Sequence, residues 1–159
     1  MRLFLALCLA TSAASACSCI QGEIGQEFAA SSVVFRGVVK NVTQLTSRVD
    51  MQRTRNAVTF SVSEYWKADL GRHITIYVIE PGTDCIGAHF DLHTEYVVFA
   101  KTQKADDYHM GNSFWYGWLD VLTKGQEFLT VNGGCSPTAA VKHAGNTLRA
   151  LGQGKRPRE

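Results

Sequence analysis

The sequence predicts a single, mainly β domain of five or six strands with one helix packed across them, arranged as a small closed or partly open barrel. Three patterns support this prediction. Two segments alternate apolar and polar residues with a period of two, further β-branched runs lie between turn residues, and an apolar stripe near the C-terminus has helical spacing. A β-sandwich remains the alternative, because a list of strands does not distinguish the two.

The first elements of the predicted domain are a short helix and a buried strand. A helix is expected within residues 22–32, where Ile24 and Phe28 are four residues apart. Residues 33–40 are β-branched and apolar on both faces, which is typical of a buried strand. Residues 44–56 are polar and predict a long hairpin that leads to the next strand.

Five further segments are predicted to be strands. Residues 58–62 and 74–78 alternate apolar and polar side chains, which favours strands with one buried face. Residues 95–101, 113–121 and 127–131 are rich in β-branched and aromatic residues, which also favour strands. Together with the first strand they provide enough elements for a small barrel.

Near the C-terminus the apolar residues change to a helical period. Ser136 is a favourable N-cap and Pro137 suits the first helical position, so a helix is expected to begin there. Its apolar stripe consists of Val141, Ala144, Leu148 and Leu151. Gly152 is expected to end the helix, and residues 153–159 are expected to form a flexible tail.

The composition excludes several classes of protein. Hydrophobic residues make up 45% of the 159-residue chain, which is enough for one apolar core. The formal net charge is +2 and the body of the chain has no basic block, so we expect no nucleic-acid partner. No apolar run reaches the roughly 18 residues that a membrane span requires. We therefore expect no membrane span, and we expect a monomer without a cofactor.

Residues 1–16 have the pattern of a secretory signal peptide. Arg2 supplies a positive charge, residues 3–10 form the short apolar region, and residues 14–16 offer a small-residue cleavage site before Cys17. The pattern predicts a secreted, extracellular protein, or a periplasmic one if it comes from a Gram-negative bacterium.

The mature domain is expected to span residues 17–152. A bacterial lipoprotein, in which Cys17 would carry the lipid, is the alternative interpretation. Such sites normally have an aliphatic residue three positions before the cysteine, where this chain has Ala14. Lipidation would also leave one of the other cysteines without a partner.

Removal of the signal peptide makes the number of cysteines even. Of five cysteines, Cys8 would be lost, and four would remain: Cys17, Cys19, Cys85 and Cys135. Four cysteines in an exported chain predict two disulfides. A bond between Cys17 and Cys19 would close a small strained ring. Both remaining pairings attach the mature N-terminus to two distant points of the chain.

Several short motifs occur in a distinctive order. They are a signal peptide that ends before Cys-x-Cys, a strand near residues 33–42, Glu64-Tyr65-Trp66-Lys67, Asp84-Cys85-Ile86-Gly87, Glu95-Tyr96-Val97-Val98-Phe99-Ala100, and Gly134-Cys135-Ser136-Pro137-Thr138. Together they resemble the N-terminal inhibitory domain of the tissue inhibitors of metalloproteinases, a netrin-like module. The resemblance implies an OB-fold barrel of five to six strands with a short N-terminal and a C-terminal helix. It also implies the disulfides Cys17–Cys85 and Cys19–Cys135.

The resemblance further implies a function as a metalloprotease inhibitor. In that family the mature N-terminal cysteine, here Cys17, chelates the catalytic zinc of the protease through its α-amino nitrogen and backbone carbonyl oxygen. The ligand enters the coordination position that water occupies in a catalytic zinc site. Ser18 would point into the specificity pocket. The other implied contacts come from Cys19 and Ile20 in the cleft and from the adjacent loop Thr83, Asp84, Cys85 and Ile86.

Two other interpretations remain beside this hypothesis. The chain could be a secreted netrin-like binding module for a protein or glycan, without inhibition, that uses its barrel surface or residues 113–121. Cys85, His89 and His93 are zinc-ligand residue types, but Cys85 is needed for a disulfide, so we expect no intrinsic metal site. We also expect no enzyme, because the chain lacks a Gly-x-Ser-x-Gly motif, a phosphate-binding glycine loop and a Cys/His pair free of disulfides.

Overall fold

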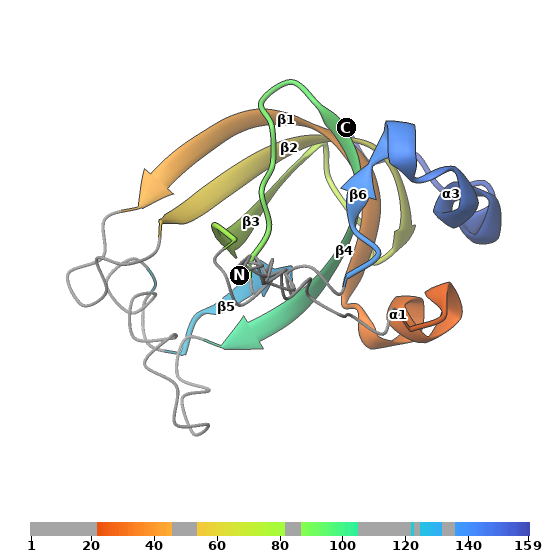
Figure 1. Cartoon of the computed structure of the whole chain (residues 1–159), viewed down its shortest axis with the longest axis horizontal. Helices are drawn as coiled ribbons and strands as arrows, with labels where there is room; N and C mark the ends of the chain where they lie inside the picture. The colour runs from red at the N-terminus through yellow and green to blue at the C-terminus, as the bar shows by residue number, and fades with distance from the viewer. Residues whose placement is uncertain (1–21, 46–53, 82–86, 105–121, 123–124, 132–135) are drawn as a thin grey trace, which may run out of the picture.

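Six strands and two short α-helices make up most of the structure, a computed structural model that describes residues 22–45, 54–81, 87–104, 122, 125–131 and 136–159 (Figure 1). The elements are α1 (Ile24–Ala30), β1 (Val33–Leu45), β2 (Arg55–Lys67), β3 (His73–Ile79), β4 (Glu95–Lys104), β5 (Glu127–Thr130), β6 (Ala139–Ala140), the 3₁₀ turn η2 (Val141–His143) and α3 (Gly145–Leu151). The prediction of a mainly β fold is confirmed. The signal peptide and the strand predicted at 113–121 lie outside the described residues.

Five of the strands pair with one another in a ring. Strand β1 pairs antiparallel with both β2 and β4, β2 pairs antiparallel with β3, and β5 pairs antiparallel with β4. The ring is completed by a parallel pairing of β3 with β5, at Tyr77 and Thr130. The sixth strand, β6, pairs antiparallel with β4 at Tyr96 and Val97, on the edge of β4 opposite β1. A closed ring leaves few unpaired strand edges, which are otherwise open to association with other chains.

The curvature that joins β1 to two partners comes from irregularities in its pairing. The register with β2 shifts at three places, the second of them between Arg36 and Gly37. Such bulges bend and twist a strand. Gly37 is needed at this position, because a Cβ there would lie 2.8 Å from the backbone oxygen of Ser61. Strand β1 can therefore follow β2 along its length while its first half pairs with β4.

The main hydrophobic core lies inside the ring. The alternating residues predicted for β2 and β3 supply much of it, since Val58, Phe60, Ile76 and Val78 are almost fully buried. Phe60 is at the centre, with Phe35 on one side and Phe90 on the other, both edge to face at 5.3 Å between ring centroids. The period-two pattern of the sequence thus identified the inner face of these strands correctly.

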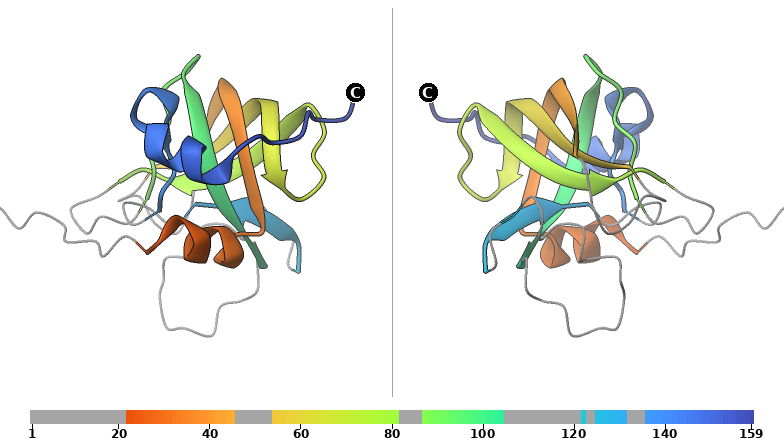
Figure 2. Two further views of the ribbon diagram at one scale, coloured as in Figure 1. Left: turned by 90° about the vertical axis from the view of Figure 1, so that its right-hand side faces the viewer. Right: turned by 90° about the vertical axis from the view of Figure 1, so that its left-hand side faces the viewer.

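A second apolar cluster lies outside the ring, where the helices cover β1 and β4. Figure 2 shows α1 and α3 on the same side of these two strands. Ile24 and Phe28 of α1 pack there as predicted, against a cluster that contains Val34 and Val97. The stripe Val141, Ala144, Leu148 and Leu151 packs on the same cluster. The apolar faces of both helices are therefore explained by one outer surface of the sheet.

Two strands are longer than the sequence pattern predicts. Strand β1 continues to Leu45 rather than ending near residue 40, because Asn41, Thr43 and Gln44 pair with β2 despite their polar side chains. Strand β2 begins at Arg55, within the segment 44–56 that was expected to be a polar hairpin. Backbone pairing does not require apolar side chains, so a hydrophobicity pattern underestimates such strand ends.

The C-terminal helix begins later than expected. Instead of starting at Ser136 and Pro137, α3 begins at Gly145, after β6 and η2. The hydroxyl of Thr138 accepts a hydrogen bond from the backbone N–H of Phe99 at 2.9 Å, and Ala139 pairs with Val97. Pairing with the edge of β4 is therefore favoured over helix formation at Thr138 and Ala139. The expected end at Gly152 is confirmed, with a φ of 66° that favours glycine.

The last residues were expected to form a flexible tail, but the structure shows them hydrogen bonded to β2 and to the β2–β3 turn. Tyr65 and Lys155 exchange backbone hydrogen bonds of 2.8 and 2.7 Å, and the N–H of Arg158 donates to Leu70. Gly154 permits this approach, because a Cβ there would lie 2.8 Å from the oxygen of Tyr65. Past the N-terminal end of β3, the edge of β2 has backbone N–H and C=O groups that β3 does not pair with. The tail forms hydrogen bonds with these groups.

Candidate functional site

The residues predicted to inhibit a protease lie outside the described residues. These are Cys17, Ser18, Cys19 and Ile20, the adjacent loop Thr83, Asp84, Cys85 and Ile86, and the disulfide partner Cys135. The structure describes the chain on either side of them. Three segments matter: α1 after the N-terminal residues, the ends of the loop at Pro81 and Gly87, and the chain from Ser136 to β6.

The segments that follow Cys19 and Cys135 meet in one cluster. Ile24, five residues after Cys19, and Ala139, four residues after Cys135, both pack against the outer apolar cluster on β1 and β4. The fold thus brings Ile24 and Ala139 to the same side of the sheet.

The helix α1 is fixed to the sheet by a lysine at its C-terminal end. The ammonium of Lys67 donates to the backbone oxygens of Phe28 and Ala29, at 2.8 and 2.9 Å. A cation at this end also interacts favourably with the helix dipole. The hydroxyl of Ser31 donates to the backbone oxygen of Glu27 at 2.8 Å. The helix that follows the N-terminal cysteines in the chain is therefore fixed to the sheet.

The loop predicted to lie beside the inhibitory residues leaves and rejoins the fold at a narrow root. The N–H of Ala88 donates to the oxygen of Ile79 at 2.8 Å, and the N–H of Glu80 donates to Thr54 at 2.9 Å. Gly87 has a φ of 114°, and a Cβ at this residue would lie only 2.3 Å from the Ile79 oxygen. Only glycine fits such a close approach without a shift of the backbone.

A charged network supports the same root. Nδ1 of His89 lies 2.9 Å from Glu80, and its Nε2 lies 3.2 Å from Asp91. Asn56 donates to the other oxygen of Glu80 at 2.5 Å, and Tyr96 donates to Asp91 at 3.3 Å. The hydrogen bond with Glu80 is the main cause that raises the pKa of His89 above its usual value, against a smaller opposing effect of burial.

The ion pair of His89 with Glu80 makes part of the folding stability depend on pH. Because its pKa is raised on folding, His89 contributes fully below about pH 6.5, the unfolded value, and loses its contribution as the pH rises through the folded-state value. We expect His89→Gln to destabilise the protein at about pH 5.5 and to have little effect at about pH 8.5. Denaturant unfolding of both proteins at the two pH values measures this.

His73→Gln is the matched control, since the side chain of His73 forms no ion pair with the described part of the chain. Its effect on stability should not follow the same pH dependence. A His89→Gln effect of equal size at both pH values would contradict the role of the ion pair.

Sequence reasoning had considered His89 and His93 only as zinc-ligand types. The structure places His89 between two carboxylates and His93 in a turn, with a φ of 62°. Within the described ranges, no group of three or more His, Cys, Asp and Glu side chains is placed to hold a metal ion. The third member of that candidate site, Cys85, lies outside them.

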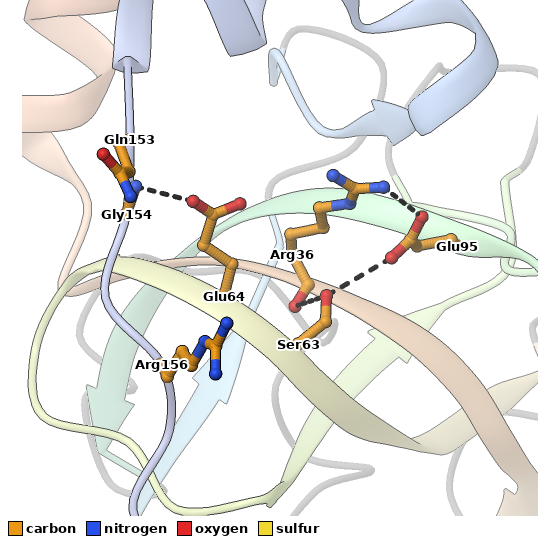
Figure 3. A pocket seen from close by; sticks show the side chains of 7 residues that line it. All are labelled: Arg36, Ser63, Glu64, Glu95, Gln153, Gly154 and Arg156. Atoms are coloured by element: carbon orange, nitrogen blue, oxygen red, sulfur yellow. Dashed lines mark hydrogen bonds and ion pairs between the residues drawn. The ribbon is translucent and has the colours of Figure 1, made fainter.

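A polar hollow of about 430 Å³ lies between the sheet and the C-terminal tail (Figure 3). Its lining consists of Arg36 from β1, Ser63 and Glu64 from β2, Glu95 from β4, and Gln153, Gly154 and Arg156 from the tail. Sequence reasoning missed this site because it assigned the tail to solvent. The only local signal is that Arg36, Glu64 and Glu95 are charged residues within strands that are otherwise largely apolar.

One ion pair and two hydrogen bonds fix the strand side chains that line the hollow. Arg36 donates to Glu95 at 2.7 Å, and Ser63 donates to the other oxygen of Glu95 at 3.2 Å. The hydrogen bond with Glu95 is the largest cause that raises the pKa of Arg36. Glu64 accepts a hydrogen bond of 2.6 Å from the backbone N–H of Gly154. The arrangement joins three strands and the tail around one cavity.

Comparison with known proteins assigns no family to this arrangement. No protein-family model matches the chain, and no curated protein matches it either. Among the helices within the described ranges, none is both long enough and apolar enough to cross a membrane.

Proposed function

We propose that the protein is a secreted metalloprotease inhibitor whose mature N-terminal residue, Cys17, chelates the catalytic zinc of the protease. The ligands are the α-amino nitrogen and the backbone carbonyl oxygen of that residue. Ser18 enters the specificity pocket, while Cys19 and Ile20 follow the cleft. The partner is a zinc metalloprotease, and the inhibitor needs no metal or cofactor of its own.

The single observation that most supports this proposal is the meeting of α1 and β6 on the outer cluster. Ile24 and Ala139 each pack against that cluster, which is compatible with a Cys19–Cys135 disulfide between the stretches that precede them. The second proposed disulfide, Cys17–Cys85, would attach the N-terminus to the loop whose root Gly87 closes. Two such bonds would fix the terminus before it binds, which reduces the ordering cost of association.

The strand order supports an OB-fold, netrin-like barrel as the scaffold. The ring runs β1-β2-β3-β5-β4 and closes from β4 to β1, and within the described residues its parallel pair is β3 with β5. An OB fold is a five-stranded, partly open Greek-key barrel. In the proposal, α1 and α3 are the N-terminal and C-terminal helices of such a domain.

The chemistry of chelation requires a free and neutral amine. An α-amino group titrates at a pKa of about 7.7 to 8.0, so its neutral form is accessible near pH 7. The amine and the carbonyl of one residue can together replace the water on a zinc ion that has three protein ligands. Removal of the signal peptide directly before Cys17 is therefore essential to the proposal.

We expect that one alanine added before Cys17 abolishes inhibition, because the amine is then displaced from the carbonyl with which it chelates. Acetylation of the same amine should have the same effect. Inhibition constants against a panel of zinc metalloproteases, measured for the mature, extended and acetylated proteins, provide the test.

A protein with one alanine added after Glu159 is the matched control, and it should inhibit as well as the mature form. Equal melting temperatures of all forms show that the changes do not act through folding. If the N-terminally extended protein inhibits as strongly as the mature one, chelation by Cys17 is wrong. Mass spectrometry of the exported protein independently determines whether cleavage occurs before Cys17.

A further inference from the structure

The polar hollow beneath the C-terminal tail has a balanced set of charges. Arg36 and Arg156 contribute two positive charges, and Glu64 and Glu95 contribute two negative ones, so its lining is formally neutral. Its volume of about 430 Å³ lies within the usual range for small-molecule sites. A neutral lining with charges of both signs favours a small ligand that is itself neutral overall but carries both signs.

The hydrogen bonds already present show which groups remain available. Both oxygens of Glu95 are occupied, one by Arg36 and the other by Ser63. Glu64 uses one oxygen for the N–H of Gly154 (Figure 3), and its other oxygen has no hydrogen-bond partner among the described residues. One carboxylate oxygen therefore remains as an acceptor for a cationic group.

The available donors lie on both sides of the hollow. Arg156 forms no hydrogen bond or ion pair with the described residues, and its planar guanidinium matches a carboxylate in two-point geometry. Nε of Arg36 is buried and lacks a hydrogen-bond partner. A buried donor without a partner often indicates a water or ligand that completes the site. The free guanidinium of Arg156 therefore favours an anionic group near the free acceptor of Glu64.

From this arrangement we infer that the hollow binds the zwitterion of a free α-amino acid, with its carboxylate on Arg156 and its ammonium on the free oxygen of Glu64. Arg36 contributes positive charge beside the ligand, and Glu95 and Ser63 hold the side chain of Arg36 in place. The site lies outside the proposed inhibitory residues and does not depend on the proposed inhibition.

Titration of the mature protein with L-alanine, followed by amide chemical shifts, tests this inference. We expect saturable binding with a Kd of about 1 mM or below, with the largest shifts at Gly154 and at the strand residues around the hollow. N-acetyl-L-alanine lacks the ammonium and L-alanine amide lacks the carboxylate. Each should bind at least about tenfold more weakly, because each leaves one charged side chain without its partner.

Two variants and one control locate the binding site. Arg156→Ala removes the proposed carboxylate ligand, and Glu64→Gln removes the negative charge while keeping an acceptor for Gly154. Both should weaken alanine binding by at least about tenfold. Arg158→Ala is the control, since Arg158 lies on the same tail but pairs with Asp69 at 3.0 Å, outside the lining. It should bind alanine like the unmodified protein.

Several results would overturn the inference. They are no saturation at about 10 mM L-alanine, equal binding of either blocked analogue, or equal loss in the Arg156→Ala and Arg158→Ala proteins. Binding of N-acetyl-L-alanine as tight as that of alanine would mean that the hollow recognises a simple anion. Loss of protease inhibition has no bearing on this test, so the two proposals fail separately.

Discussion

Phe60→Ala is expected to lower the free energy of unfolding by about 3 to 5 kcal/mol, which is the usual range for removal of a buried phenylalanine. Phe60 is fully buried at the centre of the ring. The aromatic ring of Phe60 makes edge-to-face contacts with Phe35 and Phe90. Phe90 in turn contacts Tyr96, with 4.9 Å between the ring centroids. The substitution therefore removes both a large apolar volume and the two contacts that join these aromatic residues.

The loss would be a large fraction of total stability, because domains of this size are typically stable by only about 5 to 15 kcal/mol. Denaturant unfolding at equilibrium measures it. Phe28→Ala is the matched control, since Phe28 is the same residue type but only partly buried, outside the ring. It should destabilise the protein distinctly less. Equal losses in the two variants would contradict the assignment of Phe60 to the centre of the core.

The second large effect is expected at Gly87. In Gly87→Ala the new methyl group would lie 2.3 Å from the oxygen of Ile79, the same atom that accepts the hydrogen bond from Ala88. The backbone must shift, and the bond that closes the root of the loop is lost. Conformational strain of about 1 to 3 kcal/mol adds to a similar penalty for a buried carbonyl without a partner, so we expect a loss of about 2 to 6 kcal/mol.

Gly125→Ala is the control that separates the effect of the steric collision from the effect of the strained backbone. Gly125 also has a positive φ, of 82°, but a Cβ there would meet nothing within 4 Å. Its loss should stay near 1 to 2 kcal/mol, roughly the steric penalty of a left-handed conformation. Hydrogen exchange provides a second measurement, because the amide of Ala88 should lose protection only in Gly87→Ala. Full protection of Ala88 in that variant would rule out the proposed collision.

The prediction of strands from sequence succeeded where one face is buried in the core. Val58, Phe60 and Val62 alternate because the ring has an apolar interior, and the alternation is visible along the chain. The stripe of the C-terminal helix was equally visible, since Leu148 and Leu151 pack on one surface. These patterns record burial, which side-chain chemistry encodes locally.

The prediction failed where backbone pairing decided the structure. Thr138 and Ala139 were assigned to the helix, but β4 offers them hydrogen-bond partners at Phe99 and Val97. The tail at residues 153–159 looked like solvated charge, yet it pairs with β2. Neither partner is near in sequence, and a backbone group carries no residue-specific pattern that predicts its partner.

The candidate sites also divide into one that is visible in the sequence and two that only the structure reveals. The N-terminal Cys-x-Cys is visible in the sequence, and the chemistry proposed for it comes from the resemblance of the sequence to a family of inhibitors. The charged root at His89 and the hollow between Arg36 and Arg156 appear only in three dimensions, because their members come from segments far apart in the chain.

The sequence by itself determined that this chain has a mainly β fold with an apolar interior and predicted an exported domain pinned at its N-terminus. Only the tertiary structure decided that five strands pair in a ring and that both helices share one outer face. It also decided that the C-terminal tail forms one side of a polar hollow. The physical reason is that burial follows from the character of each side chain, whereas pairing depends on which distant edges the folded chain leaves open.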